Sequence, residues 1–313
     1  MKISYSAPAK VILSGEHSVV FGKPAFVSAL DLRLRFTLWE EKKNQEKEKS
    51  IQIIEKSVKE YLQNKKIRYE DKIYAYSIQS DIPIGRGLGS SAALGVAGAA
   101  AFLEFYTGKE FSRDEINMVA YSVEKYFHKN PSGVDPSTSC FGGLIYYRKE
   151  FEFLKQISAL TFKIPRHIEN KLFLIDTGKP LETTAVMIES VGKLYNKEPA
   201  MTENVLNEME KITKRMVLSI IKEDELFFRD CLFKNEILLE KLNIVSRKAK
   251  KIIKNLSQYG TGKITGGGGK KAGSGIILFL AEDEQKMRSY CVSNDIPVLK
   301  FIHSHEGVKK ESL

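Results

Sequence analysis

The sequence has few cysteines and no cysteine pattern of the kind that binds metal. Cys140, Cys231 and Cys291 lie far apart among its 313 residues and form no C-x-x-C pair. An odd and sparse set of cysteines excludes a disulfide framework and a cysteine-built zinc site. It favours a reducing compartment, so we expect a cytoplasmic protein.

The sequence also lacks a long hydrophobic run. Its start, MKISYSAPAK, has no apolar core of signal-peptide length, because Lys10 interrupts it. Residues 87–103 carry no charge, but they consist largely of Gly, Ala and Ser and lie near the minimum length that spans a bilayer. We therefore expect a buried helix of small residues there and no association with a membrane.

The protein carries a moderate excess of positive charge. Lys and Arg number 49 against 39 Asp and Glu, and the resulting formal net charge of +10 favours anionic ligands without identifying them. Residues 40–72 mix Lys with Glu and place Ile51, Ile54 and Val58 at helical spacing, which is typical of a solvated amphipathic helix. A nucleic-acid-binding surface would instead show a basic stripe with interleaved aromatic residues, so we expect no nucleic acid partner.

Segments with strand and helix patterns fill the chain, whose length suits two domains. Ser112 and Glu115 have the spacing of a capping box that opens a helix. Residues 149–171 hold no long periodic run, so we place a domain boundary at 165, which divides 1–165 from 166–313. The patterns predict strands at 2–6, 10–14, 25–39, 74–82, 142–148, 172–177, 276–281 and 298–302, and helices at 91–108 and over most of 183–257.

The most informative segment is PIGRGLGSSAA at residues 83–93. A strand pattern enters it, three glycines remove side chains from the backbone path, and two serines open a helix. Exposed N–H groups at a helix N-terminus bind anions, and glycine lets a phosphate group approach the backbone. The alternative is a tight strand-to-helix turn that uses small residues for packing. The segment is neither a Walker loop, which needs a lysine before the serines, nor a dinucleotide fingerprint, which needs glycine where Ser90 stands.

Three segments together resemble the GHMP kinases, the small-molecule kinases named for galactokinase, homoserine kinase, mevalonate kinase and phosphomevalonate kinase. P-x-G-x-G-L-G-S-S-A-A is the central motif of that family, and APAKVILSGEHSVVFGKPA and NPSGVDPSTSCFGG resemble its mevalonate kinase branch. The match runs from Ala7 to Gly143. It implies an α+β protein with the two-domain GHMP kinase fold, whose N-terminal domain is like ribosomal protein S5 domain 2 and whose C-terminal domain is ferredoxin-like.

The resemblance assigns chemistry to four residues within or near these motifs. It makes Asp135 the base that accepts the proton of the attacking hydroxyl, and it places Lys10 beside Asp135, where the ammonium stabilises negative charge. It makes Glu124 a ligand of Mg²⁺ together with the hydroxyl of Ser91, since Mg²⁺ prefers oxygen ligands. Without the resemblance, Asp135 would be interpreted as a turn residue and Glu124 as an exposed glutamate on a helix.

Further positions are implied to bind the reactants. Glu16 and His17 resemble the substrate-contacting pair of mevalonate kinases, although a lone histidine is commonly structural. Thr183 lies in IDTGKPLETTAVM, which resembles the family's threonine-containing substrate segment but has Thr184 where mevalonate kinases typically carry lysine. The residues implied to bind the phosphates of ATP are Pro83, Gly85, Gly87, Leu88, Gly89, Ser90, Ser91 and Ala92.

A second glycine-rich stretch, KITGGGGKKAGSGIILF, departs from the family's third motif, T-G-A-G-G-G-G followed by a small residue and an apolar strand. Lys270 and Lys271 interrupt it. They either lie in solvent at the loop tip or contact an anionic group of the nucleotide or the substrate. His303 and His305 form an H-x-H without a third ligand, and we expect both at the surface.

The resemblance implies transfer of the γ-phosphoryl group of ATP, with Mg²⁺, to the 5-hydroxyl of (R)-mevalonate in isoprenoid biosynthesis, and it implies a homodimer. Because the added lysine pair suits a phosphorylated acceptor, another GHMP kinase remains an alternative, acting on phosphomevalonate, on the 3-hydroxyl of mevalonate or on a sugar. A remote alternative is a basic, non-catalytic nucleic-acid-binding protein. That alternative gives no reason for Ser91, Glu124 and Asp135 to occur together.

Overall fold

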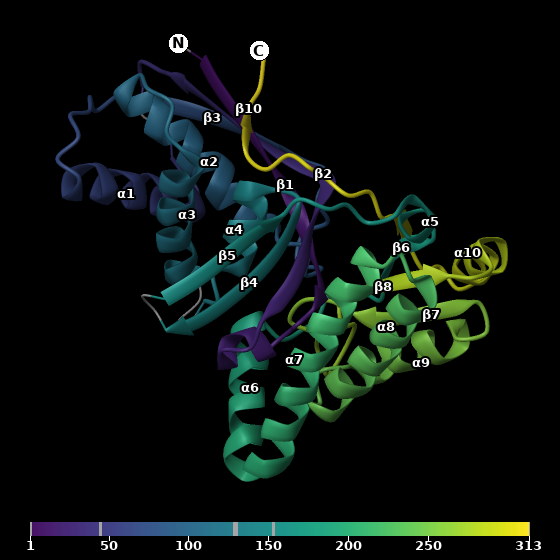
Figure 1. Ribbon diagram of the computed structural model, residues 1–313. Helices are drawn as coiled ribbons and strands as arrows, with labels where there is room; N and C mark the ends of the chain where they lie inside the picture. The colour runs from purple at the N-terminus through teal and green to yellow at the C-terminus, as the bar shows by residue number, and fades with distance from the viewer. Residues whose placement is uncertain (1, 44–45, 128–130, 152–153, 313) are drawn as a thin grey trace.

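The computed structural model describes residues 2–43, 46–127, 131–151 and 154–312. Their strands are β1 (Lys2–Ser14), β2 (Ala25–Glu40), β3 (Tyr74–Ser80), β4 (Leu144–Phe151), β5 (Leu154–Leu160), β6 (Leu172–Asp176), β7 (Gly260–Ile264), β8 (Ile276–Ala281), β9 (Val298–Lys300) and β10 (Lys309–Lys310). These strands form a six-stranded sheet with order β10-β1-β2-β4-β5, in which β3 also pairs with β2, and a four-stranded sheet with order β7-β8-β6-β9 (Figure 1). The α+β class expected from the sequence is confirmed.

One layer of helices covers the six-stranded sheet. These helices are α1 (Lys49–Asn64), α2 (Ser90–Thr107), α3 (Arg113–Phe127) and α4 (Val134–Phe141). The small-residue helix α2 packs on β1 and β2, with α1 and α3 against it. Its glycines permit this close approach, since a Cβ at Gly98 would lie 3.1 Å from Cδ1 of Ile54. The expectation of a buried helix is confirmed, and among the described residues no helix has the length and apolar character to cross a membrane.

The strand β1 carries the first motif into the centre of the molecule. It runs without interruption through Pro8, where the sequence predicts a break, and its register against β2 shifts between Pro8 and Ala9. Every residue from Ile3 to Ser14 is buried, which includes the side chain of Lys10. A lysine enclosed in this way must find a partner for its charge inside the protein.

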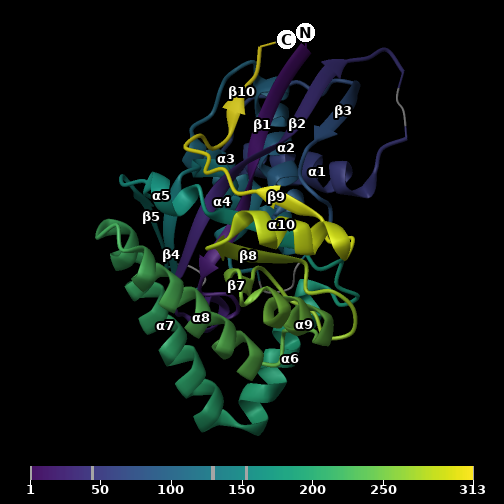
Figure 2. The ribbon, with the colours of Figure 1, turned by 90° about the vertical axis from the view of Figure 1, so that its right-hand side faces the viewer.

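The second set of helices packs on and beside the four-stranded sheet (Figure 2). It comprises α5 (Arg166–Glu169), α6 (Thr184–Lys197), α7 (Pro199–Ile221), α8 (Glu225–Lys241), α9 (Arg247–Leu256) and α10 (Glu284–Ser293), while a short 3-10 helix, η1 (Ser18–Phe21), follows β1. The helices α8 and α9 pack on β7, and α7 packs on α8 and also reaches β1 and β2. The helix α8 also contacts β1, so α8 links the two sheets, with α7 packed beside it.

Three elements differ from the sequence-based expectation. The strand β5 occupies part of the stretch expected to be irregular, and α4 is a helix where the sequence predicts only a turn. The strand β10 returns to the six-stranded sheet, where Lys310 pairs with Tyr5, and both chain ends lie at the same end of the molecule (Figures 1 and 2). Residues beyond the boundary predicted at 165 thus complete the first sheet. Two lysines carry no strand pattern, so this pairing has no signal in the sequence.

Candidate active site

A cavity of about 490 Å³ lies where β1, the two glycine-rich loops and the segment before α6 meet. Its volume suits a small-molecule site. The cavity draws its walls from both halves of the chain and from every motif that carries the family resemblance. The expected site residues that line it are Lys10, His17, Gly85, Gly87, Gly89, Ser90, Ser91, Glu124, Asp135 and Thr183.

Lys10 and Asp135 form an ion pair in this cavity, with 3.0 Å between Nζ and Oδ1. Lys10 comes from β1, and Asp135 lies in the first turn of α4, which begins after Gly133 at a left-handed φ of 87°. The side chain of Lys10 is only 3% exposed, whereas that of Asp135 is 30% exposed. The carboxylate is therefore open to a reactant, while the ammonium is shielded from water and fixed beside it.

Glu124 extends from α3 into the same cavity, so the alternative of an exposed helix glutamate is wrong. Its Oε2 is buried without a hydrogen-bond partner among the described residues. Burial, and then the charge of Asp135, raise the pKa of Glu124 to about 8. A cation would supply the missing partner, so Glu124 and the hydroxyl of Ser91, which lines the same cavity, fit Mg²⁺, an ion that keeps several waters and binds phosphates. The described residues contain no cluster of three or more His, Cys, Asp and Glu side chains that would form an all-protein metal site.

The central glycine-rich loop lies against the second one, backbone to backbone. Gly85, Gly87 and Gly89 have φ values of 71°, 86° and 77°, in the left-handed region that glycine tolerates. A Cβ at Gly87 would lie 3.2 Å from the carbonyl oxygen of Thr265. Since α2 begins at Ser90, directly after Gly89, its unpaired N–H groups lie at the cavity and can bind phosphate oxygens.

Three of the eight residues implied to bind the phosphates of ATP do not line the cavity. Leu88 is 1% exposed and packs in the hydrophobic core, and Pro83 and Ala92 also lie outside the lining. The apolar side chain of Leu88 is drawn into the core. Its carbonyl oxygen accepts a hydrogen bond from the backbone N–H of Lys10 at 3.0 Å, so Leu88 supports the site from behind.

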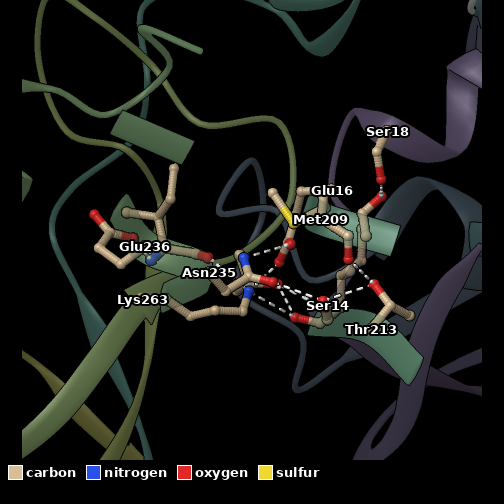
Figure 3. Close-up of polar contacts among 12 residues, drawn as sticks. Ser14, Glu16, Ser18, Met209, Thr213, Asn235, Glu236 and Lys263 are labelled. Atoms are coloured by element: carbon tan, nitrogen blue, oxygen red, sulfur yellow. Dashed lines mark hydrogen bonds and ion pairs between the residues drawn. The ribbon is translucent and has the colours of Figure 1, made fainter. Parts of the chain in front are cut away.

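His17 and Glu16 are adjacent in sequence but take different places. His17 lines the cavity, and its Nε2 lies 3.0 Å from the carbonyl oxygen of Gly267. Burial lowers the pKa of the His17 imidazole to about 4, so the ring is neutral at pH 7. Glu16 is fully buried outside the lining and forms an ion pair with Lys263 (Figure 3). This placement corrects the expectation that Glu16 contacts the substrate, because an enclosed and paired carboxylate leaves no side for a ligand.

Two cations that line the cavity had no assigned role in the sequence analysis. Arg86 pairs through Nε with Oδ2 of Asp176 at 2.8 Å, and its buried Nη1 has no hydrogen-bond partner among the described residues. The stem of Lys179 crosses Gly85, with its Cε 2.9 Å from the position of a Cβ there. Both lie within segments that carry the family resemblance, and their position in or beside a glycine-containing stretch is the signal in the sequence that could have identified them.

Lys270 and Lys271, by contrast, do not line the cavity. The Nζ of Lys270 donates a hydrogen bond to Oγ of Ser190 on α6 at 2.6 Å, and its backbone N–H donates to Glu182. Lys271 is exposed. Of the two lysines that interrupt the second glycine-rich loop, Lys270 therefore ties the loop to α6 and Lys271 faces solvent.

Thr183 lines the cavity and also opens α6, because its Oγ1 accepts a hydrogen bond from the backbone N–H of Val186 at 3.3 Å. His305 is exposed as expected. His303 is partly buried, with its Nδ1 2.8 Å from Oγ of Ser28, which corrects the expectation that it lies freely at the surface. Asn130, the first residue of the middle motif, lies outside the described residues.

Comparisons with known proteins show which family the chain resembles over its whole length. The profile "GHMP kinases N terminal domain" matches residues 52–143. A mevalonate kinase of Pyrococcus furiosus is 30% identical over 100% of this chain and 99% of its own length. A solved structure of a mevalonate kinase has a TM-score of 0.77 at 25% identity, covering 97% of this chain and 99% of that one. The mevalonate kinase of Methanococcus jannaschii has a TM-score of 0.75 at 25% identity, covering 97% and 98%.

Proposed function

The chain belongs to the GHMP kinase family, and from that membership we propose that it is a mevalonate kinase, which transfers the γ-phosphoryl group of ATP to the 5-hydroxyl of (R)-mevalonate and releases 5-phosphomevalonate and ADP. The observation that carries the proposal is the ion pair of Lys10 and Asp135 inside a cavity bounded by the central glycine-rich loop. A base, a fixed cation and a phosphate-binding loop are the parts that phosphoryl transfer to a hydroxyl requires.

We propose a role for each part. The half-open carboxylate of Asp135 accepts the proton of the 5-hydroxyl as its oxygen attacks the γ-phosphorus atom. Lys10 holds that carboxylate in place and adds positive charge beside the transferring group. The N–H groups at the start of α2, with Ser90 and Ser91, orient the phosphates. Because little covalent chemistry is required, positioning and electrostatics supply most of the rate enhancement.

We propose Mg²⁺ as the metal that accompanies ATP. When bound, Mg²⁺ would neutralise charge on the β- and γ-phosphates. Glu124 would hold it, since its Oε2 is buried without a partner among the described residues, and the hydroxyl of Ser91 would complete the protein's share of the ligands.

The lysine pair of the second glycine-rich loop gives no support to a phosphorylated acceptor, and the cations that line the cavity besides Lys10 are Arg86 and Lys179. The pair that suggested such an acceptor, Lys270 and Lys271, lies outside the cavity lining. The neutral imidazole of His17 and the hydroxyls of Thr183 and Thr184 also line the cavity, and such groups suit hydroxyl and carboxylate groups of a small acid.

Two further points belong to the proposal. We propose a cytoplasmic protein, because its three cysteines are free and buried, as suits a reducing compartment. We also propose a homodimer, as the resemblance to the family implies, and sedimentation velocity over a range of concentrations tests it. A single monomeric species throughout that range would contradict the dimer.

The experiment that tests the function is ADP release measured with mevalonate, 5-phosphomevalonate, galactose and homoserine as separate acceptors. We expect kcat/KM for mevalonate to exceed that for each other acceptor by at least about 100-fold. Turnover with another acceptor under conditions in which mevalonate is inert would overturn the proposal.

A further inference from the structure

A fully buried ion pair joins the end of β1 to β7 behind the cavity. Lys263 and Glu16 are both 0% exposed, and Nζ of Lys263 donates to Oε1 of Glu16 (Figure 3). The same Nζ donates to the carbonyl oxygens of Ile12 at 3.2 Å and Ile264 at 2.9 Å. An ammonium group has three donors, so every donor of Lys263 is used within the protein.

The other oxygen of Glu16 leads to two helices. Asn235 of α8 donates from Nδ2 to Oε2 of Glu16 at 3.4 Å and accepts at Oδ1 from Oγ of Ser14 at 2.6 Å. Oγ of Ser14 lies 2.8 Å from Oγ1 of Thr213 on α7. Figure 3 shows these side chains pointing toward one another around Glu16. The network thus ties the end of β1 to α7, α8 and β7 at once.

The residues held by this network adjoin residues that line the cavity. Ile12, whose carbonyl oxygen binds Lys263, lies two residues after Lys10 on β1. Glu16 directly precedes His17, which adopts a positive φ of 58° and lies against the carbonyl oxygen of Gly267. Oγ1 of Thr265 adds a second link by pairing with the backbone N–H and carbonyl of Ile12 at 3.0 and 3.1 Å.

A requirement for stability alone does not explain an ion pair here. Taking two charges out of water costs free energy, and well-packed apolar residues commonly stabilise a core as well or better. Directional hydrogen bonds to one carboxylate oxygen and two carbonyl oxygens do fix the relative position of the parts they join. A pair of this kind is suited to a place where position affects function.

We propose that Lys263 and Glu16 are positioning residues, which set the placement of Lys10 and His17 at the cavity without contacting the reactants. The inference rests on the proposed function, because the effect on catalysis assumes phosphoryl transfer to mevalonate. It replaces the expected substrate contact of Glu16 with an indirect role through its neighbour His17. It also gives a role to Lys263, which lies outside the three segments that together resemble the GHMP kinases and is the first residue of the second glycine-rich stretch.

The test compares Lys263→Met, Glu16→Gln and the double variant. Lys263→Met leaves a buried carboxylate without its cation and should lower Tm. The double variant removes both charges, so it should recover much of that loss. Its kcat/KM for mevalonate should nevertheless stay about 10- to 100-fold below the parent, because a displacement of about 1 Å in a reacting site has effects of that size. Its KM for ATP should remain within about twofold, since the phosphate loop is untouched.

The matched control is Lys310→Met. Lys310 also pairs with a buried carboxylate, that of Glu104 at 2.7 Å, but it lies on β10 away from the cavity. This variant should lower Tm and leave both KM values unchanged. A double variant with parental kcat and KM for mevalonate would reduce the Lys263–Glu16 pair to a structural element and overturn the inference.

A second readout separates this inference from the proposed function. The imidazole of His17 can be followed by NMR in the parent and the double variant without any substrate. We expect its pKa, about 4 in the parent, to rise toward the ordinary value once the ion pair no longer holds the segment that carries His17. An unchanged titration of His17 would overturn the positioning role. If the parent does not phosphorylate mevalonate but the His17 titration moves, the proposed function fails and the positioning of His17 stands.

Discussion

Two lysine–carboxylate ion pairs each include one residue of the segment 10–16, Lys10 in one pair and Glu16 in the other. The two pairs differ in their accessibility to solvent and reactants. Lys10 and Asp135 face the cavity with side chains 3% and 30% exposed, whereas Lys263 and Glu16 are both 0% exposed. The same two functional groups therefore serve different purposes. A carboxylate open on one side can exchange a proton with a reactant, while an enclosed one can only hold other groups in place. Accessibility, rather than residue type, separates the proposed base from the positioning residue.

The largest effect is expected from removing the open carboxylate. Asp135→Asn should lower kcat by about 1,000-fold, because the amide cannot accept the proton of the hydroxyl. ATP affinity should stay nearly unchanged, since Asp135 is not part of the phosphate loop. Steady-state kinetics and calorimetric titration with ATP measure the two quantities. Loss of ATP binding in a folded variant would contradict the role given to Asp135.

The two lysines should differ in their contribution to stability. Lys263→Met leaves Glu16 charged and enclosed, so it should reduce the free energy of unfolding by about 3–5 kcal/mol. Lys10→Met leaves Asp135 partly in contact with water and should cost about 1.5 kcal/mol. Urea unfolding of both variants gives the comparison. Equal losses would mean that the difference in exposure does not govern the energetics of the two pairs.

Metal dependence tests the third carboxylate, Glu124. Glu124→Gln removes the charged ligand but keeps the size of the side chain. The Mg²⁺ concentration that gives half-maximal activity should rise at least about tenfold, since losses of 10- to 100-fold accompany even changes in outer-shell partners of metal sites. Titration of the activity with Mg²⁺ at saturating ATP measures it. An unchanged Mg²⁺ requirement would remove Glu124 from the site.

Acidification should destabilise the protein through His17. Burial lowers its pKa to about 4, so between that value and about 6.5 the unfolded chain binds a proton that the folded chain does not. Stability therefore falls as the pH falls, by about 2 kcal/mol between pH 7.5 and pH 5. His17→Asn, which tolerates the positive φ at this position, should remove that share of the pH dependence. Urea unfolding at both pH values is the measurement, and an identical slope in parent and variant would contradict it.

The smallest effect is expected at the loop tip. Lys271 is exposed and does not line the cavity, so Lys271→Met should change kcat/KM for mevalonate by no more than about twofold. The same kinetic assay measures it. A tenfold loss would return this lysine to the list of groups that bind a reactant.

Much of the fold follows from local patterns in the sequence. An uninterrupted apolar run gives the bounds of β8, residues 276–281, and the spacing of Ser112 and Glu115 gives a capping box whose hydrogen bonds the structure contains. The elements that were missed depend on distant partners. The strand β10 is two lysines that pair with β1, and α4 is a helix of eight residues enclosed by its neighbours.

The residues of the site also divide into those that local motifs predict and those whose position depends on distant parts of the chain. Motif positions gave Lys10, Asp135 and Glu124, and the structure brings all three to one cavity. Which of the other cations reach it depends on the path of the chain in space. Lys179 crosses the phosphate loop and Lys270 turns to Ser190, although both stand in glycine-containing segments. Spacing alone also does not reveal that Glu16 is enclosed, because its partner Lys263 lies 247 residues away.

The central claim is that the open carboxylate receives the proton of one particular hydroxyl, the primary one. The most direct test is NMR of the product that the purified protein forms from ATP and (R)-mevalonate, with the ³¹P signal correlated to the protons of the carbon that carries the phosphate. We expect a phosphate coupled to the two protons at C5. A phosphate on the tertiary C3 oxygen, which has no directly attached CH protons, or the absence of any phosphorylated product, would contradict it.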